Sequence, residues 1–222
     1  MYKAILYKEW IKIKWVLVGF AAICLAVLVY IGLDSRHNIE MSGAIKTWLL
    51  IIQRKVLYYS LLKYIPLFAG IALAVAQFVP EMTKNRFRLS FHLPIDEKRM
   101  LLFMILIGLL TNMLVYILII VGLMITGSAF YPQEIVLSSL ITVTPWLLAG
   151  IAGYLAASMI VIESTWKNRI ILSIISIAYF NLLFLENGYN EYRFSFWYYF
   201  IVVILFSITI LFPGYRLRKG SK

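Results

Sequence analysis

Long apolar runs alternate with short polar segments along the whole chain. Six of these runs are long enough, or nearly so, to cross the roughly 30 Å hydrocarbon core of a bilayer as α-helices. Because lipid cannot satisfy backbone N–H and C=O groups, we expect each run to be helical. The strict alternation of apolar and polar residues that marks a membrane barrel is absent from the sequence. The predicted spans cover residues 15–33, 60–79, 100–126, 135–162, 170–185 and 198–212.

The composition agrees with a chain embedded in lipid. Of its 222 residues, 63% are hydrophobic and 14% are charged, and the mean hydropathy is +0.88. Soluble domains carry about 25% charged residues. The sequence therefore predicts an all-α integral membrane protein with a single transmembrane domain, residues 1–222. The first apolar run is too long for a signal-peptide core and precedes no small-residue cleavage site, so we expect a retained span.

The basic residues indicate how the predicted helices are oriented. Of the 21 lysines and arginines, 15 fall on one side of the membrane, in the N-terminus, segment 80–99, the link 163–169 and the C-terminus. Cytoplasmic segments are enriched in Lys and Arg, so we expect a multi-pass protein with both termini in the cytoplasm. The formal net charge of +11 is explained by this topology and by anionic inner-leaflet lipid, without nucleic acid.

Two segments outside the spans have helical patterns. Residues 1–14 predict an amphipathic interfacial helix on the inner leaflet, although a frayed basic leader is the alternative. Its apolar stripe and its opposite, charged side comprise Tyr2, Leu6, Trp10 and Ile13, and Lys8, Glu9 and Lys12. Segment 34–59 predicts either a helix that runs into the second span or a short helix on the outer surface.

The sequence contains little that points to catalysis. No P-loop and no H-E-x-x-H motif occurs, and neither histidine lies in a predicted span, so we do not expect an enzyme. One cysteine and two histidines argue against a metal site. Three intramembrane polar residues are candidates for a substrate path or for hydrogen bonds between helices: Gln77, Asn112 and Asn181.

Prolines and small residues predict local features of the spans. Pro66 and Pro145 are expected to kink the second and fourth spans. Small residues recur at spacings of four on the same two spans, where they would let helices approach closely. These residues are Gly70 and Ala74, and Ala149, Gly153 and Ala157.

Segment 80–99 differs from an ordinary connecting loop. It combines five basic residues with a row of large apolar residues, Phe87, Leu89, Phe91, Leu93 and Ile95. Leu89 and Leu93 share one helical face, and Pro94 would end that helix. A short helix with apolar and basic faces suits docking against a cytoplasmic protein. The alternative is a helix that lies on the inner leaflet.

The run E-M-T-K-N-R-F-R-L-S-F-H-L-P-I-D-E-K-R-M, residues 81–100, resembles the cytoplasmic connector of ATP-binding-cassette (ABC) transporter permeases of the exporter-like second type. The matching residues are Glu81, Leu89, Phe91, Leu93, Pro94 and Ile95. The basic N-terminal helix, six spans and cytoplasmic termini are also similar. The chain departs from the family in having Arg86-Phe87 where Gly-Thr is common, and in lacking a Lys within residues 103–108.

The resemblance implies that this connector is a coupling helix seated on a separate ATPase subunit. Two ATPase copies would bind ATP and Mg²⁺, and a second permease chain would complete the pathway in the plasma membrane of a prokaryote. The chain itself would need no cofactor. The implied docking residues are Glu81, Arg86, Phe87, Arg88, Leu89, Phe91, His92, Leu93 and Pro94, with Trp166 as a second contact.

The implied function is export of a substrate, or ATP-driven work on a periplasmic or envelope partner. A different function also fits the residues. The chain could be a self-contained channel or an envelope-assembly scaffold, with segment 81–99 on lipid and no ATPase partner.

Overall fold

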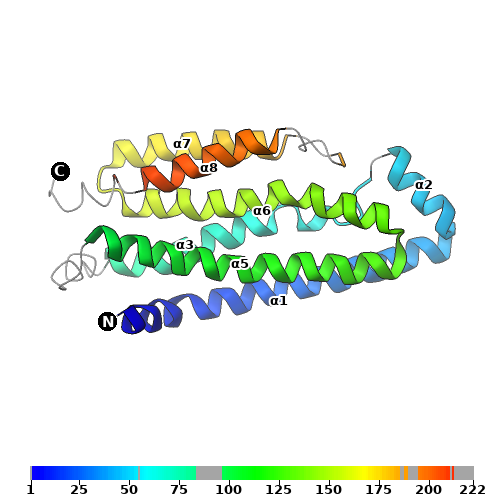
Figure 1. Ribbon diagram of the computed structural model, residues 1–222, viewed down its shortest axis with the longest axis horizontal. Coiled ribbons are helices and arrows are strands. Elements are labelled where there is room, and N and C mark those ends of the chain that lie inside the picture. Colours follow the sequence, from blue (N-terminus) through cyan, green and yellow to red (C-terminus); the bar gives the residue numbers. More distant parts are fainter. Residues whose placement is uncertain are drawn as a thin grey trace.

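The protein is an elongated bundle of helices (Figure 1). The computed structural model describes residues 2–54, 56–83, 97–185, 188–189, 195–210 and 212. These residues contain helices and no β-strand, which confirms the predicted all-α class. Most of the predicted coupling segment, residues 84–96, lies outside the described residues.

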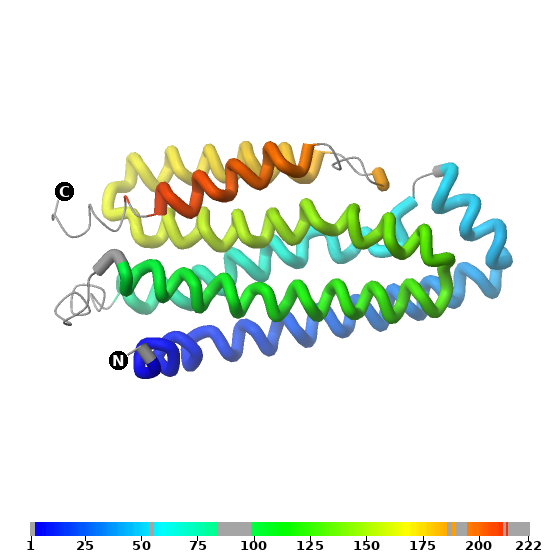
Figure 2. Tube along the Cα trace, in the orientation of Figure 1, coloured from blue at the N-terminus to red at the C-terminus, as the bar shows by residue number. Residues whose placement is uncertain are grey.

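The chain begins with its longest helix, α1 (Tyr2–Ser42), which contains 41 residues and is about 60 Å long. The predicted interfacial helix 1–14 and the first span are therefore parts of one continuous helix. Gly43 ends it, with a φ of +81° that side chains disfavour. Helix α2 (Ala44–Arg54) follows and lies across the end of the bundle (Figure 2). Of the two predictions for segment 34–59, the separate short helix is closer to the structure.

A short 3-10 helix, η1 (Ser60–Leu62), leads into α3 (Ile65–Thr83). Pro66 lies in the first turn of α3, where its missing N–H costs nothing. The prediction placed Pro66 within a kinked span, whereas in the structure it lies at the start of α3, just after η1. Helix α3 also continues through Pro80, beyond the predicted end at residue 79.

Two long helices follow, α5 (Glu97–Phe130) and α6 (Gln133–Ile162). Helix α6 packs against α3 at very short range. A Cβ atom on Gly70 would lie 2.1 Å from the backbone oxygen of Gly150, and one on Gly153 would lie 2.8 Å from Leu67 Cδ1. The prediction that small residues allow close helix approach is confirmed at Gly70 and Gly153. These contacts make α3 and α6 the centre of the bundle.

The last two helices are α7 (Trp166–Leu183) and α8 (Phe196–Thr209). Both run beside α6, on the side away from α1 (Figure 1). Tyr179 of α7 donates a hydrogen bond to the backbone oxygen of Tyr199 in α8 at 2.8 Å, and its ring lies edge-on to Phe206. Tyr179 therefore links the two helices, which otherwise pack mainly against α6.

The long helices begin and end at two opposite ends of the bundle. At one, α1, α5 and α7 begin, and α3, α6 and α8 end (Figure 1). We call this the basic end, because Lys8, Lys12, Lys14, Arg99 and Arg169 lie in the helix turns nearest to it.

Four of the helical segments are long and apolar enough to cross a membrane, counted over the described residues. They are Lys3–Ser42, Ser60–Thr83, Arg99–Phe130 and Gln133–Ile162. Many large apolar side chains on these helices are exposed on the outside of the bundle, among them Val18, Leu25, Leu110 and Ile117. An apolar exterior of this kind is suited to lipid, so the chain is built as a multi-pass membrane protein.

Candidate functional site

Glu81 lies at the basic end, in the last turn of α3, where the described part of α3 leads toward the predicted coupling segment. Its side chain is only 1% exposed. A carboxylate that is removed from water is costly unless cations and hydrogen-bond donors surround it. The fold supplies these cations from the start of α1.

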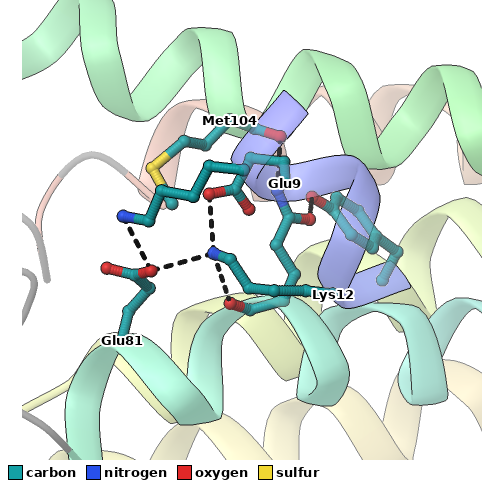
Figure 3. A network of polar contacts seen from close by, with 7 residues as sticks. Glu9, Lys12, Glu81 and Met104 are labelled. Atoms are coloured by element: carbon teal, nitrogen blue, oxygen red, sulfur yellow. Dashed lines mark hydrogen bonds and ion pairs between the residues drawn. The ribbon is translucent and has the colours of Figure 1, made fainter. Parts of the chain in front are cut away.

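Two lysines from α1 bind the same oxygen of Glu81. Lys8 Nζ and Lys12 Nζ each lie 2.9 Å from Glu81 Oε1. Lys12 also contacts Glu9 Oε1 at 2.6 Å and the backbone oxygen of Gln77 at 3.4 Å. Figure 3 shows Lys12 between the carboxylates of Glu9 and Glu81. The four side chains carry two positive and two negative charges, and we call them the lysine–glutamate cluster.

The cluster is connected to α5 and α6 through Gln77, which lies one turn before Glu81 in α3. The Gln77 side chain donates from Nε2 to the backbone oxygen of Met104 in α5 at 2.8 Å. It accepts at Oε1 from the Tyr154 hydroxyl of α6 at 2.7 Å. Gly108 leaves room for this arrangement, because a Cβ there would lie 2.0 Å from the Tyr154 hydroxyl. Helices α1, α3, α5 and α6 therefore meet in one polar network (Figure 3).

The second carboxylate oxygens of the cluster, Glu9 Oε2 and Glu81 Oε2, are buried and make no hydrogen bond among the described residues. Each carboxylate thus uses only one oxygen, and the pairing is incomplete. The arrangement forms a polar contact that joins α1 to α3. Among the described residues, no group of three or more His, Cys, Asp or Glu side chains lies close enough together to hold a metal ion.

The start of α1 is turned differently from the sequence prediction. Glu9 is completely buried and Lys12 is 14% exposed, so the charged side of this segment faces the bundle. Leu6 and Trp10, from the predicted apolar stripe, point outward and are exposed, whereas Ile13 is buried. The physical reason is Glu81, whose buried charge requires cations from α1. The sequence signal that could have revealed this is the acidic residue Glu9 within a basic leader.

The predicted intramembrane polar residues have different surroundings. Gln77 and Asn112 both make hydrogen bonds between helices. Asn112 Nδ2 donates to the Tyr116 hydroxyl at 2.8 Å and to the backbone oxygen of Gly150 at 3.4 Å. Asn181 is exposed and donates to the backbone oxygen of Ile177 in its own helix at 2.9 Å. The structure therefore brings Gln77 and Asn112 into the core of the bundle and leaves Asn181 on its outside.

The residues predicted to dock an ATPase fall into two groups. Glu81 is buried within the lysine–glutamate cluster, and Trp166 is 75% exposed at the start of α7. Both lie at the basic end of the bundle. The others lie outside the described residues, and their docking role stays a prediction: Arg86, Phe87, Arg88, Leu89, Phe91, His92, Leu93 and Pro94.

The fold and the site define an all-helical protein of the multi-pass membrane class, with a buried charge cluster at one end. Comparisons with protein-family models, with curated proteins and with solved structures gave no match. The functional argument therefore depends on the residues and their contacts.

Proposed function

We propose that this chain is the permease subunit of an ABC transporter, working with a separate ATPase at its basic end. The basic end would face the cytoplasm of a prokaryotic cell. Helices α7 and α8 would serve as the fifth and sixth spans. At 18 residues, α7 is about 27 Å long, which is close to the thickness of the hydrocarbon core.

The observation that carries this proposal is the position of Glu81. This residue lies at the start of the predicted coupling segment, residues 80–99, and the lysine–glutamate cluster attaches it to α1. Gln77, one turn earlier, is hydrogen-bonded to α5 and α6. A displacement of the coupling segment would therefore act on four helices, three of them linked by direct polar contacts to α3. Such a link is what an ATPase needs to move the spans.

The proposed cycle uses this link in a simple way. ATP binding would bring two ATPase subunits together, and each would shift a coupling segment. Glu81 would transmit the shift to α1, and Gln77 would transmit it to α5 and α6. A second permease chain would complete the pathway, through which a substrate is exported or work is done on an envelope partner.

The proposal is tested by asking whether a P-loop ATPase co-purifies with this chain. The double variant Leu89→Asp, Phe91→Asp should lose the ATPase and still insert in the membrane. Leu49→Asp, on the exposed side of α2 at the opposite end, is the matched control and should retain it. If no P-loop protein accompanies the wild-type chain, or if the double variant retains one fully, the proposal is wrong. The first of these results would favour a self-contained channel or scaffold.

A further inference from the structure

A groove of about 650 Å³ opens beside the basic end, between α3 and α7. Helix α6 forms its floor with Ile160 and Val161, and Val79 of α3 and Ile174 of α7 line its walls. Ile174 is strongly exposed, so the groove opens on the apolar exterior of the bundle. From Trp166 to Ile174 it follows α7 for about 12 Å. This is most of the roughly 15 Å hydrocarbon depth of one leaflet.

The mouth of the groove is cationic and held in a defined geometry. Arg169 donates from Nε to the backbone oxygen of Glu163 at 2.7 Å. Its guanidinium carbon lies 5.5 Å from the centre of the Trp166 ring, at cation–π distance. These two contacts hold the guanidinium in place before a ligand binds. Binding therefore costs less side-chain entropy than it would for a freely moving arginine.

The charges around the mouth favour an anion. Lys167 is exposed next to Trp166, so two basic side chains lie in the first turn of α7. The nearby carboxylate of Glu163 is buried and accepts at Oε1 from the Ser164 N–H and the Thr165 hydroxyl, each at 3.2 Å. Its charge is thus directed toward its own backbone and away from bulk water.

We propose that this groove binds a phospholipid with an anionic headgroup, drawn from the leaflet at the basic end. The acyl chain would lie between α3 and α7, and the phosphate would face Arg169 and Lys167. A planar guanidinium suits two phosphate oxygens at once. An exposed indole is typical of the headgroup level of a membrane, where Trp166 would lie. An apolar groove with a cationic mouth complements this class of ligand better than a soluble anion, which would leave the groove unfilled.

The test is native mass spectrometry of the full chain, released from detergent after incubation with equal amounts of phosphatidylglycerol and phosphatidylcholine. The wild type should retain phosphatidylglycerol preferentially. Arg169→Gln should weaken that retention about fivefold, the effect of one basic residue near a membrane surface, and leave phosphatidylcholine unchanged. Arg36→Gln removes the same charge at the opposite end and should match the wild type. Ser173→Phe, which fills the groove, should lower retention of both lipids.

Three results would overturn the proposal. Equal retention of both lipids by the wild type would mean ordinary lipid contact without a site. Unchanged phosphatidylglycerol retention in Arg169→Gln would show that the guanidinium takes no part in recognising the lipid. Loss of a co-purifying protein from Arg169→Gln, with lipid unchanged, would make the mouth a protein-docking surface. The first two results do not depend on whether an ATPase binds this chain, so failure here and failure of the proposed function are separable.

Discussion

Lys12 of α1 and Glu81 of α3 form an ion pair of 2.9 Å between residues 69 positions apart in the chain. The glutamate is 1% exposed and the lysine 14%. Burial at this level makes the pair very different from a surface ion pair, because each charge depends on the other for compensation. The pair fixes the start of α1 to the end of α3, at the place where we propose that force enters the protein.

Removing the Glu81 charge should destabilise the protein strongly. Glu81→Leu leaves Lys12 mostly buried with Glu9 as its remaining partner, and breaking a buried pair in this way costs about 3 kcal/mol. Cys24 offers the measurement. It is the single cysteine and is fully buried, so a thiol-reactive fluorescent dye reports unfolding as temperature rises. The labelling midpoint should fall by several degrees.

The control for this change is the pair of Arg36 and Glu40, 2.7 Å apart and largely exposed at the opposite end. Glu40→Leu should leave the midpoint unchanged, since exposed pairs contribute little. The double variant Lys12→Met, Glu81→Leu should lose less stability than the losses of the two single variants added together. Strict additivity would show that the two residues do not interact.

The close approach of α3 and α6 should not tolerate a methyl group. Gly70→Ala would place a carbon 2.1 Å from a backbone oxygen of Gly150, and neither helix backbone can yield without moving its neighbours. Overpacking of this kind costs about 1–3 kcal/mol. Gly19→Ala is the matched control, because a Cβ there meets nothing within 4 Å. Dye labelling of Cys24 should occur at a lower temperature in the first variant only.

The hydrogen bonds of Gln77 should matter more than its volume. Gln77→Leu keeps a similar size but leaves the Met104 carbonyl and the Tyr154 hydroxyl without this partner, at a cost of about 1–3 kcal/mol. Tyr154→Phe should cost less, about 1 kcal/mol, because only one bond to Gln77 is lost. Gln53→Leu, on exposed α2, should change nothing. If Cys24 in Gln77→Leu is labelled with the same temperature midpoint as in the wild type, the network has no structural role.

The orientation in the membrane can be tested on a Cys24→Ser background. Met41→Cys places a thiol at the exposed outer end of α1, and Lys3→Cys places one at the basic end. A membrane-impermeant maleimide added to intact cells should label the first and spare the second until the cells are permeabilised. Labelling in the reverse order would place the basic end outside and contradict the proposed cytoplasmic ATPase site.

The sequence by itself determined the helices of this protein and most of their limits. Runs of about 20 apolar residues can only be helical in lipid, and this local requirement needs no knowledge of neighbouring chain segments. The predicted spans at 100–126 and 135–162 lie within α5 and α6. The predicted span at 60–79 is covered by η1 and α3, except for a turn at residues 63 and 64. The small residues Gly70 and Gly153 likewise marked the helix pair that packs most closely.

Only the tertiary structure decided which side of α1 faces inward and what Glu81 does. The pattern of residues 1–14 predicted that the charged side turns away from apolar surroundings, which holds for an isolated helix on a membrane. In the folded chain, the buried carboxylate of Glu81 attracts Lys8 and Lys12, and Glu9 is buried with them. Burial of charge depends on partners distant in sequence, so periodicity within one helix cannot predict it.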